Sequence, residues 1–340
     1  MSSDAMASDA TSFNGRAEPR RRRVLLVGQG PTAASALSGL LAGHDVVSLV
    51  RAAGPGDEAV RLAGEAGVPL QPDATTAGVA DLVTALQPDC VVVSSFSRIL
   101  PPDLLASCAF LNVHYSALPR YRGRANVNWA VINGETEAAI SLHELVAELD
   151  AGDVLYQERI PVGPRTTAGE LYVALNAIQE RELAAAVTRL LSGDGAAPQD
   201  DSQATFGCSR IPTDGELQWT TSTQDLDRLV RGLSQPWPGA YTFRGLQKIW
   251  VDDAEPSPDS RVYEGRVPGR VVRVSRSDGW VDVLTGDGAL RLHRLRLEDG
   301  SPVDAAAELR SVRETLGLRS SDLVDELVRL RRRIAELGGE

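Results

Sequence analysis

The 340-residue sequence is poor in lysine, cysteine and histidine, and it has no long apolar run. Lys248 is its only lysine, so arginine carries nearly all of the positive charge. Three cysteines are too few for a disulfide framework in a chain of this length. They do not cluster with the four histidines, and we expect no metal site. No stretch approaches the roughly 20 apolar residues of a membrane span, which favours a cytoplasmic protein without a membrane contact.

The sequence also has no excess of positive charge. The formal net charge is −11, which argues against a nucleic-acid footprint along the whole chain. Residues 205–300 hold 13 basic residues against 14 acidic ones, so the second half offers no basic surface for a phosphate backbone. We therefore consider nucleic acid an unlikely partner.

Alternating strand and helix patterns predict an α/β fold in the first half of the chain. The run "VLLVG" is continuous, as expected for a parallel strand that is covered on both faces. The alternation predicts a doubly wound, mostly parallel sheet, and later strand patterns predict a smaller, β-rich, OB-like domain. The expected order is a disordered leader (1–22), an N-terminal catalytic domain (23–197), a linker (198–208), the β-rich domain (209–300) and a helical tail (301–340).

Two helices are predicted in the tail. The first, "DAAAELRSVRETLG", places Leu309, Val312 and Leu316 on one face and ends at Gly317. The second has a short leucine-zipper-like seam at steps of four and three residues, formed by Leu323, Leu327, Leu330, Ile334 and Leu337. The tail could form a helical hairpin that packs on its own chain, or it could join two chains as a homodimer.

The turn "GQG" at residues 28–30 follows the first strand and resembles part of a dinucleotide-binding fingerprint. The pattern G-x-G-x-x-G fails because Ala33 stands at the position of the third glycine. The second strand ends in Arg51 and offers no acid for a ribose hydroxyl. We therefore expect no nicotinamide cofactor.

The strand pattern "AFLNVH" ends with two polar residues. Asn112 and His114 are two residues apart, so their side chains face the same way on a strand. Asp150 follows in the loop "ELDAGD", where Ala151 and Gly152 allow a sharp turn. At the carboxyl edge of an open sheet these groups suit acyl transfer to an amine. Asn112 and a protonated His114 could stabilise an oxyanion, and Asp150 could hold the histidine or relay a proton.

The segments "SRIL", "LNVHYSALPRYRG" and "LDAGDVLYQ" together resemble the N-x-H…D signature of folate-dependent formyltransferases. This family includes methionyl-tRNA, glycinamide ribonucleotide and amino-sugar formyltransferases. From about residue 24 to 297 the sequence is most similar to the formyltransferase part of UDP-4-amino-4-deoxy-L-arabinose formyltransferase. The leader and the tail lie outside this resemblance.

The resemblance implies transfer of a formyl group from 10-formyltetrahydrofolate, a consumed co-substrate, to a primary amine. It implies a catalytic role for Asn112, His114 and Asp150. The residues that would hold the pterin are Arg98, Ile99, Leu100, Glu148 and Leu149. The residues that we predict to bind the acceptor are Tyr115, Ser116, Arg120, Arg122 and Arg124. Tyr115 and Asn126 depart from the pattern common in the family, and both bear on the identity of the acceptor.

The arginine-rich loop after the catalytic strand favours a small anionic acceptor, such as a nucleotide-linked amino sugar or another biosynthetic amine. Three alternatives stay open at this point. The chain could formylate methionyl-tRNA, it could hydrolyse the formyl folate, or it could be a folate-binding scaffold without catalysis. His143, in "SLHEL", could face either the cleft or solvent.

Overall fold

The computed structural model describes residues 20–30, 32–72, 75–124 and 126–338. Most of the predicted leader, residues 1–19, lies outside this range. Arg21, at the end of the predicted leader, is already anchored because its guanidinium donates to the carboxylate of Asp45 at 2.7 Å. None of the described helices is long and apolar enough to cross a membrane.

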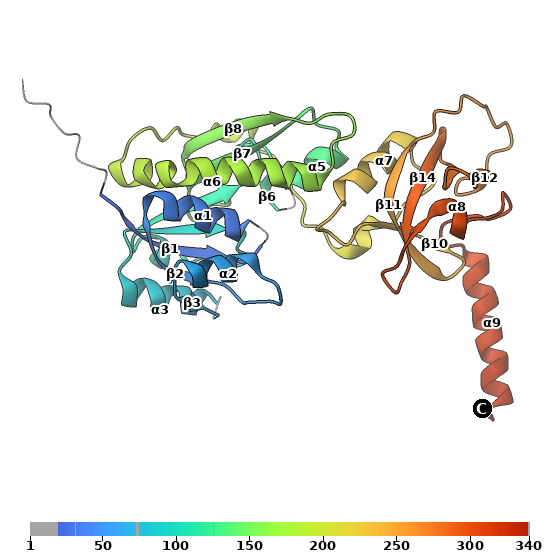
Figure 1. Cartoon of the computed structure of the whole chain (residues 1–340), viewed down its shortest axis with the longest axis horizontal. Coiled ribbons are helices and arrows are strands. Elements are labelled where there is room, and N and C mark those ends of the chain that lie inside the picture. The colour runs from blue at the N-terminus through green and yellow to red at the C-terminus, as the bar shows by residue number, and fades with distance from the viewer. Residues whose placement is uncertain (1–19, 31, 73–74, 125, 339–340) are drawn as a thin grey trace, which may run out of the picture.

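The first domain is built on a seven-stranded sheet in the order β3-β2-β1-β4-β5-β7-β8 (Figure 1). The first five of these strands are parallel, whereas β7 and β8 run antiparallel at one edge. This confirms the predicted mostly parallel sheet. The strands are β1 (Arg23–Gly28), β2 (Asp45–Val50), β3 (Leu70–Gln71), β4 (Cys90–Ser94), β5 (Ala109–His114), β7 (Glu137–Glu144) and β8 (Val154–Pro161).

Helices cover both faces of this sheet, which explains the continuous apolar runs in its central strands. Along β1, Leu26 belongs to the core under α1 and α6, and its neighbour Leu25 belongs to the core under α3 and α4. Both side chains are fully buried, as expected for a doubly wound sheet. The helices are α1 (Ala33–Gly43), α2 (Glu58–Glu65), α3 (Thr76–Leu86), α4 (Pro102–Leu105), α5 (Asn126–Ile132) and α6 (Ala168–Ser192).

Helix α6 begins where the sequence predicts. Thr167 accepts a hydrogen bond from the backbone N–H of Glu170, and the Glu170 carboxylate accepts one from the N–H of Thr167. This capping box satisfies two backbone N–H groups that the first turn leaves without a helical partner. The helix ends at Gly193, whose φ of +74° suits a residue without a Cβ.

The second domain is an antiparallel sheet with α7 (Thr223–Gly232) packed on it, which confirms the predicted β-rich domain. A short two-stranded sheet, β6 (Arg122–Gly123) with β9 (Phe206–Gly207), and the 3-10 turns at Asp201–Gln203 and Pro212–Gly215 lie near the linker. The strands of the second domain are β10 (Ala240–Arg244), β11 (Gln247–Pro256), β12 (Val271–Ser275), β13 (Trp280–Leu284), β14 (Ala289–Arg296) and β15 (Pro302–Asp304).

The prediction for the first tail helix is wrong. Only α8 (Ala305–Glu308) is helical, and the chain then turns back onto the second domain. Leu309 and Leu316 are buried in the core of that domain, while Val312 is exposed. The predicted hairpin is therefore absent, and the residues up to about 316 complete the β-rich domain. The second helix, α9 (Ser320–Glu336), forms as predicted.

A buried ion pair fastens the two domains together. Asp227 on α7 accepts from Arg231 at 2.9 Å and from Arg165 of the first domain, also at 2.9 Å. Arg231 in turn donates to the backbone oxygen of Thr166 at 2.7 Å. The charges of Asp227 and Arg231 are almost completely removed from solvent, so each depends on the other for compensation.

Candidate active site

The site is assembled where β5 ends. Asn112 and His114 project from the same face of this strand, and His143 of β7 pairs directly opposite Asn112. His114 and His143 are buried, and their rings meet edge to face with centroids 6.1 Å apart. His143 is fully buried, which excludes the solvent-facing alternative considered for it. The two neighbouring strands thus deliver three polar side chains to one point.

Asp150 folds back over this point from the loop between β7 and β8. Its Oδ1 accepts from Nδ2 of Asn112 at 3.2 Å, and its Oδ2 lies 3.5 Å from Nδ1 of His114. The backbone N–H of Gly123 donates to Oδ2 at 2.8 Å. The φ of Asp150 is +49°, a left-handed conformation that is uncommon for a residue other than glycine. The structure therefore brings Asn112, His114 and Asp150 together, as the sequence predicts.

The surroundings of Asp150 and His114 lower the pKa of both groups. Burial would raise the pKa of Asp150, but His143, His114 and the N–H of Gly123 together lower it to about 2. Burial lowers the pKa of His114 below its usual value, and the opposing effect of the Asp150 charge is smaller. Burial thus favours the neutral imidazole, whereas the adjacent Asp150 carboxylate favours the protonated ring that we considered from the sequence.

Asn126 is a contact that the sequence did not predict. Its Nδ2 lies 2.9 Å from Nε2 of His114, and the backbone oxygen of Tyr121 lies 2.8 Å from the same nitrogen. A donor and an acceptor thus compete for one ring nitrogen. Neutral His114 with its hydrogen on Nδ1 accepts from Asn126, whereas a ring with a hydrogen on Nε2, whether neutral or protonated, donates to Tyr121. Asn126 therefore stabilises the neutral form that carries its hydrogen on Nδ1.

Replacing Asn126 by alanine is expected to raise the pKa of His114 by about 0.5 to 1 unit, because one hydrogen bond to the neutral ring is worth roughly 1 kcal/mol. Histidine NMR titration measures this directly, and the acid limb of the kcat/KM profile should move with it. Asn133→Ala is the matched control, since Asn133 contacts the Tyr121 hydroxyl and not His114. An unchanged or lowered pKa in Asn126→Ala would contradict this account of the ring.

Three polar residues, Gln199, Arg122 and Asp201, form a clamp between the linker and the loop that carries Asp150. Gln199 donates from Nε2 to the backbone oxygens of Asp150 and Gly152, at 2.8 and 2.7 Å. Its Oε1 accepts from Arg122 at 2.8 Å, and Arg122 also pairs with Asp201 at 2.6 Å. The buried guanidinium of Arg122 thus ties the linker to the loop that carries Asp150. We accordingly propose no substrate contact for Arg122.

Gln199→Leu should reduce kcat by about 10- to 100-fold, because Asp150 loses the hydrogen bonds that fix its backbone and small displacements of a catalytic group are costly. Steady-state kinetics would measure the loss. Gln203→Leu is a fitting control because Gln203 bonds only to the exposed Asp200 in the same turn. Equal kinetics in the two variants would show that the clamp does not position Asp150.

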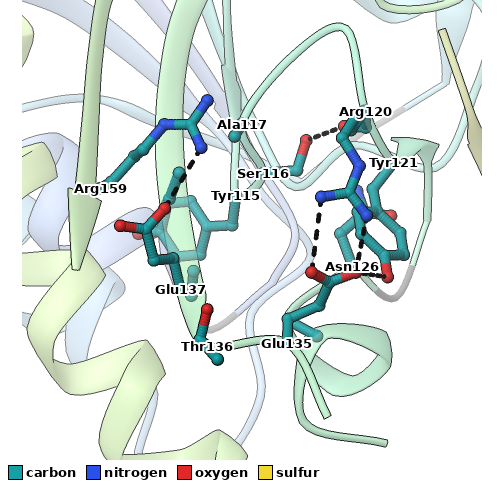
Figure 2. Close-up of a pocket in the computed structure, with 13 residues that line it drawn as sticks. Tyr115, Ser116, Ala117, Arg120, Tyr121, Asn126, Glu135, Thr136, Glu137 and Arg159 are labelled. Carbon is teal, nitrogen blue, oxygen red and sulfur yellow. Dashed lines mark hydrogen bonds and ion pairs between the residues drawn. The ribbon is translucent and has the colours of Figure 1, made fainter. Parts of the chain in front are cut away.

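A cavity of about 150 Å³ adjoins the cluster beyond the end of β5. Figure 2 shows two ion pairs on its walls, Arg120 with Glu135 and Arg159 with Glu137. Their nitrogen–oxygen distances are 2.7 and 3.3 Å. The wall is therefore polar and carries both signs of charge.

Two residues connect this cavity to His114. Asn126 and Tyr121 line the cavity and also make the two contacts to the Nε2 of the ring. Ser116 lines the cavity as well, but it is buried and donates its hydroxyl to the backbone oxygen of Arg120. Tyr115 also lines the wall, and its hydroxyl donates to Asn176 of α6, away from the cavity. Arg124 is exposed.

The segments predicted to hold the pterin lie on two loops. Ile99 is 87% exposed and Leu149 is 57% exposed, so each presents a large apolar side chain to solvent. Arg98 and Glu148 are exposed beside them, whereas Leu100 is buried in the core. Exposed apolar side chains on the loops next to the catalytic cluster suit contact with a flat heterocycle.

The "GQG" turn is closed by protein groups. The guanidinium of Arg51 donates to the backbone oxygens of Gly28 and Gly30, both at 3.0 Å. Arg51 also pairs with Asp57, the residue that caps α2. Arg51 thus connects the turn to the start of α2. The described residues also contain no group of three or more histidine, cysteine or acidic side chains that could hold a metal ion.

Comparison with known families identifies the family of this chain. A profile described as formyl transferase matches residues 22–188, and one described as formyl transferase, C-terminal domain, matches residues 211–313. The chain belongs to the formyl transferase family. This confirms the predicted family. The cluster of Asn112, His114 and Asp150 lies within the first match, and α9 lies beyond the second.

Several solved structures share the fold. HypX from Aquifex aeolicus in complex with tetrahydrofolic acid has a TM-score of 0.62 at 20% identity, over 86% of this chain and 48% of that one. WlaRD, a sugar 3N-formyl transferase crystallised in the presence of dTDP and 5-N-formyl-THF, has a TM-score of 0.58 at 14% identity. The match covers 81% of this chain and 97% of that one. A likely sugar N-formyltransferase from Mycobacterium tuberculosis has a TM-score of 0.52 at 18% identity. The match covers 65% of this chain and 91% of that one. The chain spans about half the length of the HypX structures.

Proposed function

We propose that this formyltransferase transfers the formyl group of 10-formyltetrahydrofolate to the primary amine of a small anionic acceptor, most plausibly a nucleotide-linked amino sugar. The observation that carries the proposal is the convergence of Asn112, His114 and the charged Asp150 at the end of β5. The similarity to structures that contain tetrahydrofolic acid or 5-N-formyl-THF supports the choice of donor.

Each member of the cluster has a distinct task in this proposal. Asn112 and the Nδ1–H of neutral His114 donate hydrogen bonds to the formyl oxygen as it becomes an oxyanion. At rest the amide of Asn112 donates to His143 and Asp150, and Nδ1 of His114 faces Asp150 at 3.5 Å. The formyl oxygen would therefore replace Asp150 at one N–H of Asn112 and at Nδ1–H of His114. Asp150, ionised and buried, accepts the proton that the attacking amine loses. That proton then passes to the departing folate nitrogen, so charge and atoms balance.

The donor fits the two exposed loops. Ile99 and Leu149 offer apolar surfaces for the pterin, and Arg98 and Glu148 offer polar edges beside them. Leu100 is buried in the core and so anchors the loop that carries Arg98 and Ile99. A substitution such as Leu149→Asp would test this placement, and it should weaken folate binding without unfolding the chain, since the side chain is already exposed.

The acceptor fits the cavity beside His114. Arg120 is the best placed cation for an anionic substituent, because it lies on the cavity wall and keeps about half of its side chain exposed. Arg124 is the second exposed cation of the same loop. The similarity to WlaRD, whose structure contains dTDP, favours a sugar nucleotide. The balanced charge of the second domain disfavours tRNA.

An acceptor panel tests the proposal. The protein is incubated with 10-formyltetrahydrofolate and UDP- or dTDP-linked amino sugars, ornithine derivatives or methionyl-tRNA, and products are identified by mass spectrometry. We expect formylation of a sugar nucleotide, with a raised KM in Arg120→Ala. Formylated tRNA, or formate released equally with and without any amine, would overturn the proposed acceptor in favour of the tRNA enzyme or the hydrolase.

A further inference from the structure

The last helix, α9, has no partner within the part of the chain that the structure describes. It projects away from the second domain (Figure 1), and none of its residues is buried. Five large apolar side chains nevertheless line one face and form a seam: Leu323, Leu327, Leu330, Ile334 and Leu337, each between 43% and 79% exposed. A lone helix of this length is only marginally stable in water, so a covered seam would stabilise it.

The spacing of the seam is that of a coiled coil. Leu323, Leu330 and Leu337 fall at position d of the heptad, and Leu327 and Ile334 fall at position a. Leucine fills the three d positions, and Ile334 gives one of the two a positions the β-branched residue that, together with leucine at d, favours two parallel strands; the other a position is Leu327. The absent hairpin leaves this face without the intrachain cover that the sequence suggested as one alternative.

The charges beside the seam are complementary between two copies. Glu326 stands at position g, and Arg331 stands at position e, five residues further on. In a parallel pair these positions face each other across the interface. Glu326 contacts only Arg329 on its own helix, and Arg331 forms no ion pair with any described residue. Each helix thus offers one acidic and one basic group where its partner would offer the opposite charge.

We propose that α9 pairs with the α9 of a second copy of this chain, in parallel and in register, as a two-stranded coiled coil. The formyl transferase matches end at residue 313, so this helix lies outside the matched domains. Its role is to hold two catalytic chains together. The proposal does not depend on which acceptor is formylated.

Sedimentation of the full chain over a range of concentrations tests the pairing. We expect a species of twice the 36.3 kDa chain mass, and a dissociation constant more than about 100-fold higher in Leu327→Asp, because two leucines leave the interface per dimer. Val328→Asp is the matched control, since Val328 lies off the seam on the same helix. A monomeric chain, or a dimer equally stable in Leu327→Asp, would overturn the proposal.

Charge exchange tests the parallel register. Glu326→Arg and Arg331→Glu should each weaken the dimer, because each places like charges in apposition, and the double variant should regain the original stability. Failure of the double variant to recover would overturn the parallel arrangement. Formyl transfer measured in each variant would separate a loss of assembly from a loss of folding.

Discussion

Asp150→Asn is expected to lower kcat by about 10²- to 10⁴-fold, the usual contribution of a positioned proton acceptor. The asparagine keeps nearly the same shape and can still accept from the N–H of Gly123, but it carries no charge and cannot accept the proton of the amine. Because the pKa of Asp150 is about 2, the carboxylate is present throughout the neutral range. The loss should therefore appear at every pH at which the enzyme is assayed.

Asp153→Asn, in the same loop, is the control, and it should leave kcat unchanged. The acid limb of the wild-type kcat/KM profile should report His114 rather than Asp150, and it should lie below the ordinary histidine value of about 6.5. The lowered pKa of Asp150 also stabilises the fold above about pH 4, and this contribution disappears as the pH falls towards 2. A wild-type level of turnover in Asp150→Asn would exclude Asp150 as the proton acceptor.

Asp227→Ala is expected to reduce the free energy of unfolding by about 3–5 kcal/mol, the usual cost of leaving a buried charge without its partner. The uncompensated charge would be that of Arg231, which lies in the interface between the two domains. Urea unfolding followed by tryptophan fluorescence would measure the change. Asp225→Ala on the same helix removes only an exposed ion pair with Arg228 and should cost less than about 0.5 kcal/mol.

The pair Asp227 and Arg231 also allows a sharper test. Replacing both by apolar residues, as in Asp227→Leu with Arg231→Met, should recover much of the lost stability, because no charge then remains buried. A double variant as unstable as Asp227→Ala would mean that the contact with Thr166, rather than the ion pair, fastens the domains.

Local patterns predicted the features that depend on neighbouring residues. The continuous run around Leu25 and Leu26 predicted a strand covered on both faces, and Thr167 with Glu170 predicted the start of α6. The N-x-H pair on β5 was predicted in the same way, because side chains two residues apart on a strand share a face. Asp150 was placed beside them by its loop chemistry and by the family resemblance.

Features that depend on distant segments could not be read from these patterns. His143, Asn126 and Gln199 join the site only because β7, α5 and the linker fold against β5. The sequence marked His143 and Asn126 as unusual but did not predict their contacts, and it contained no signal for Gln199. The segment that contains Leu309 and Leu316 has helical spacing, yet burial of both side chains in the second domain overrides its helical propensity. The lowered pKa of His114 likewise follows from burial that the sequence does not display.

The most direct test of formyl transfer is its stoichiometry. With 10-formyltetrahydrofolate and a sugar-nucleotide amine, we predict one tetrahydrofolate released for each formylated amine, at a rate that falls by at least about 10²-fold in His114→Ala. Tetrahydrofolate released with an equal amount of free formate, and no formylated amine from any acceptor, would contradict the assignment of this chain's site to amine formylation.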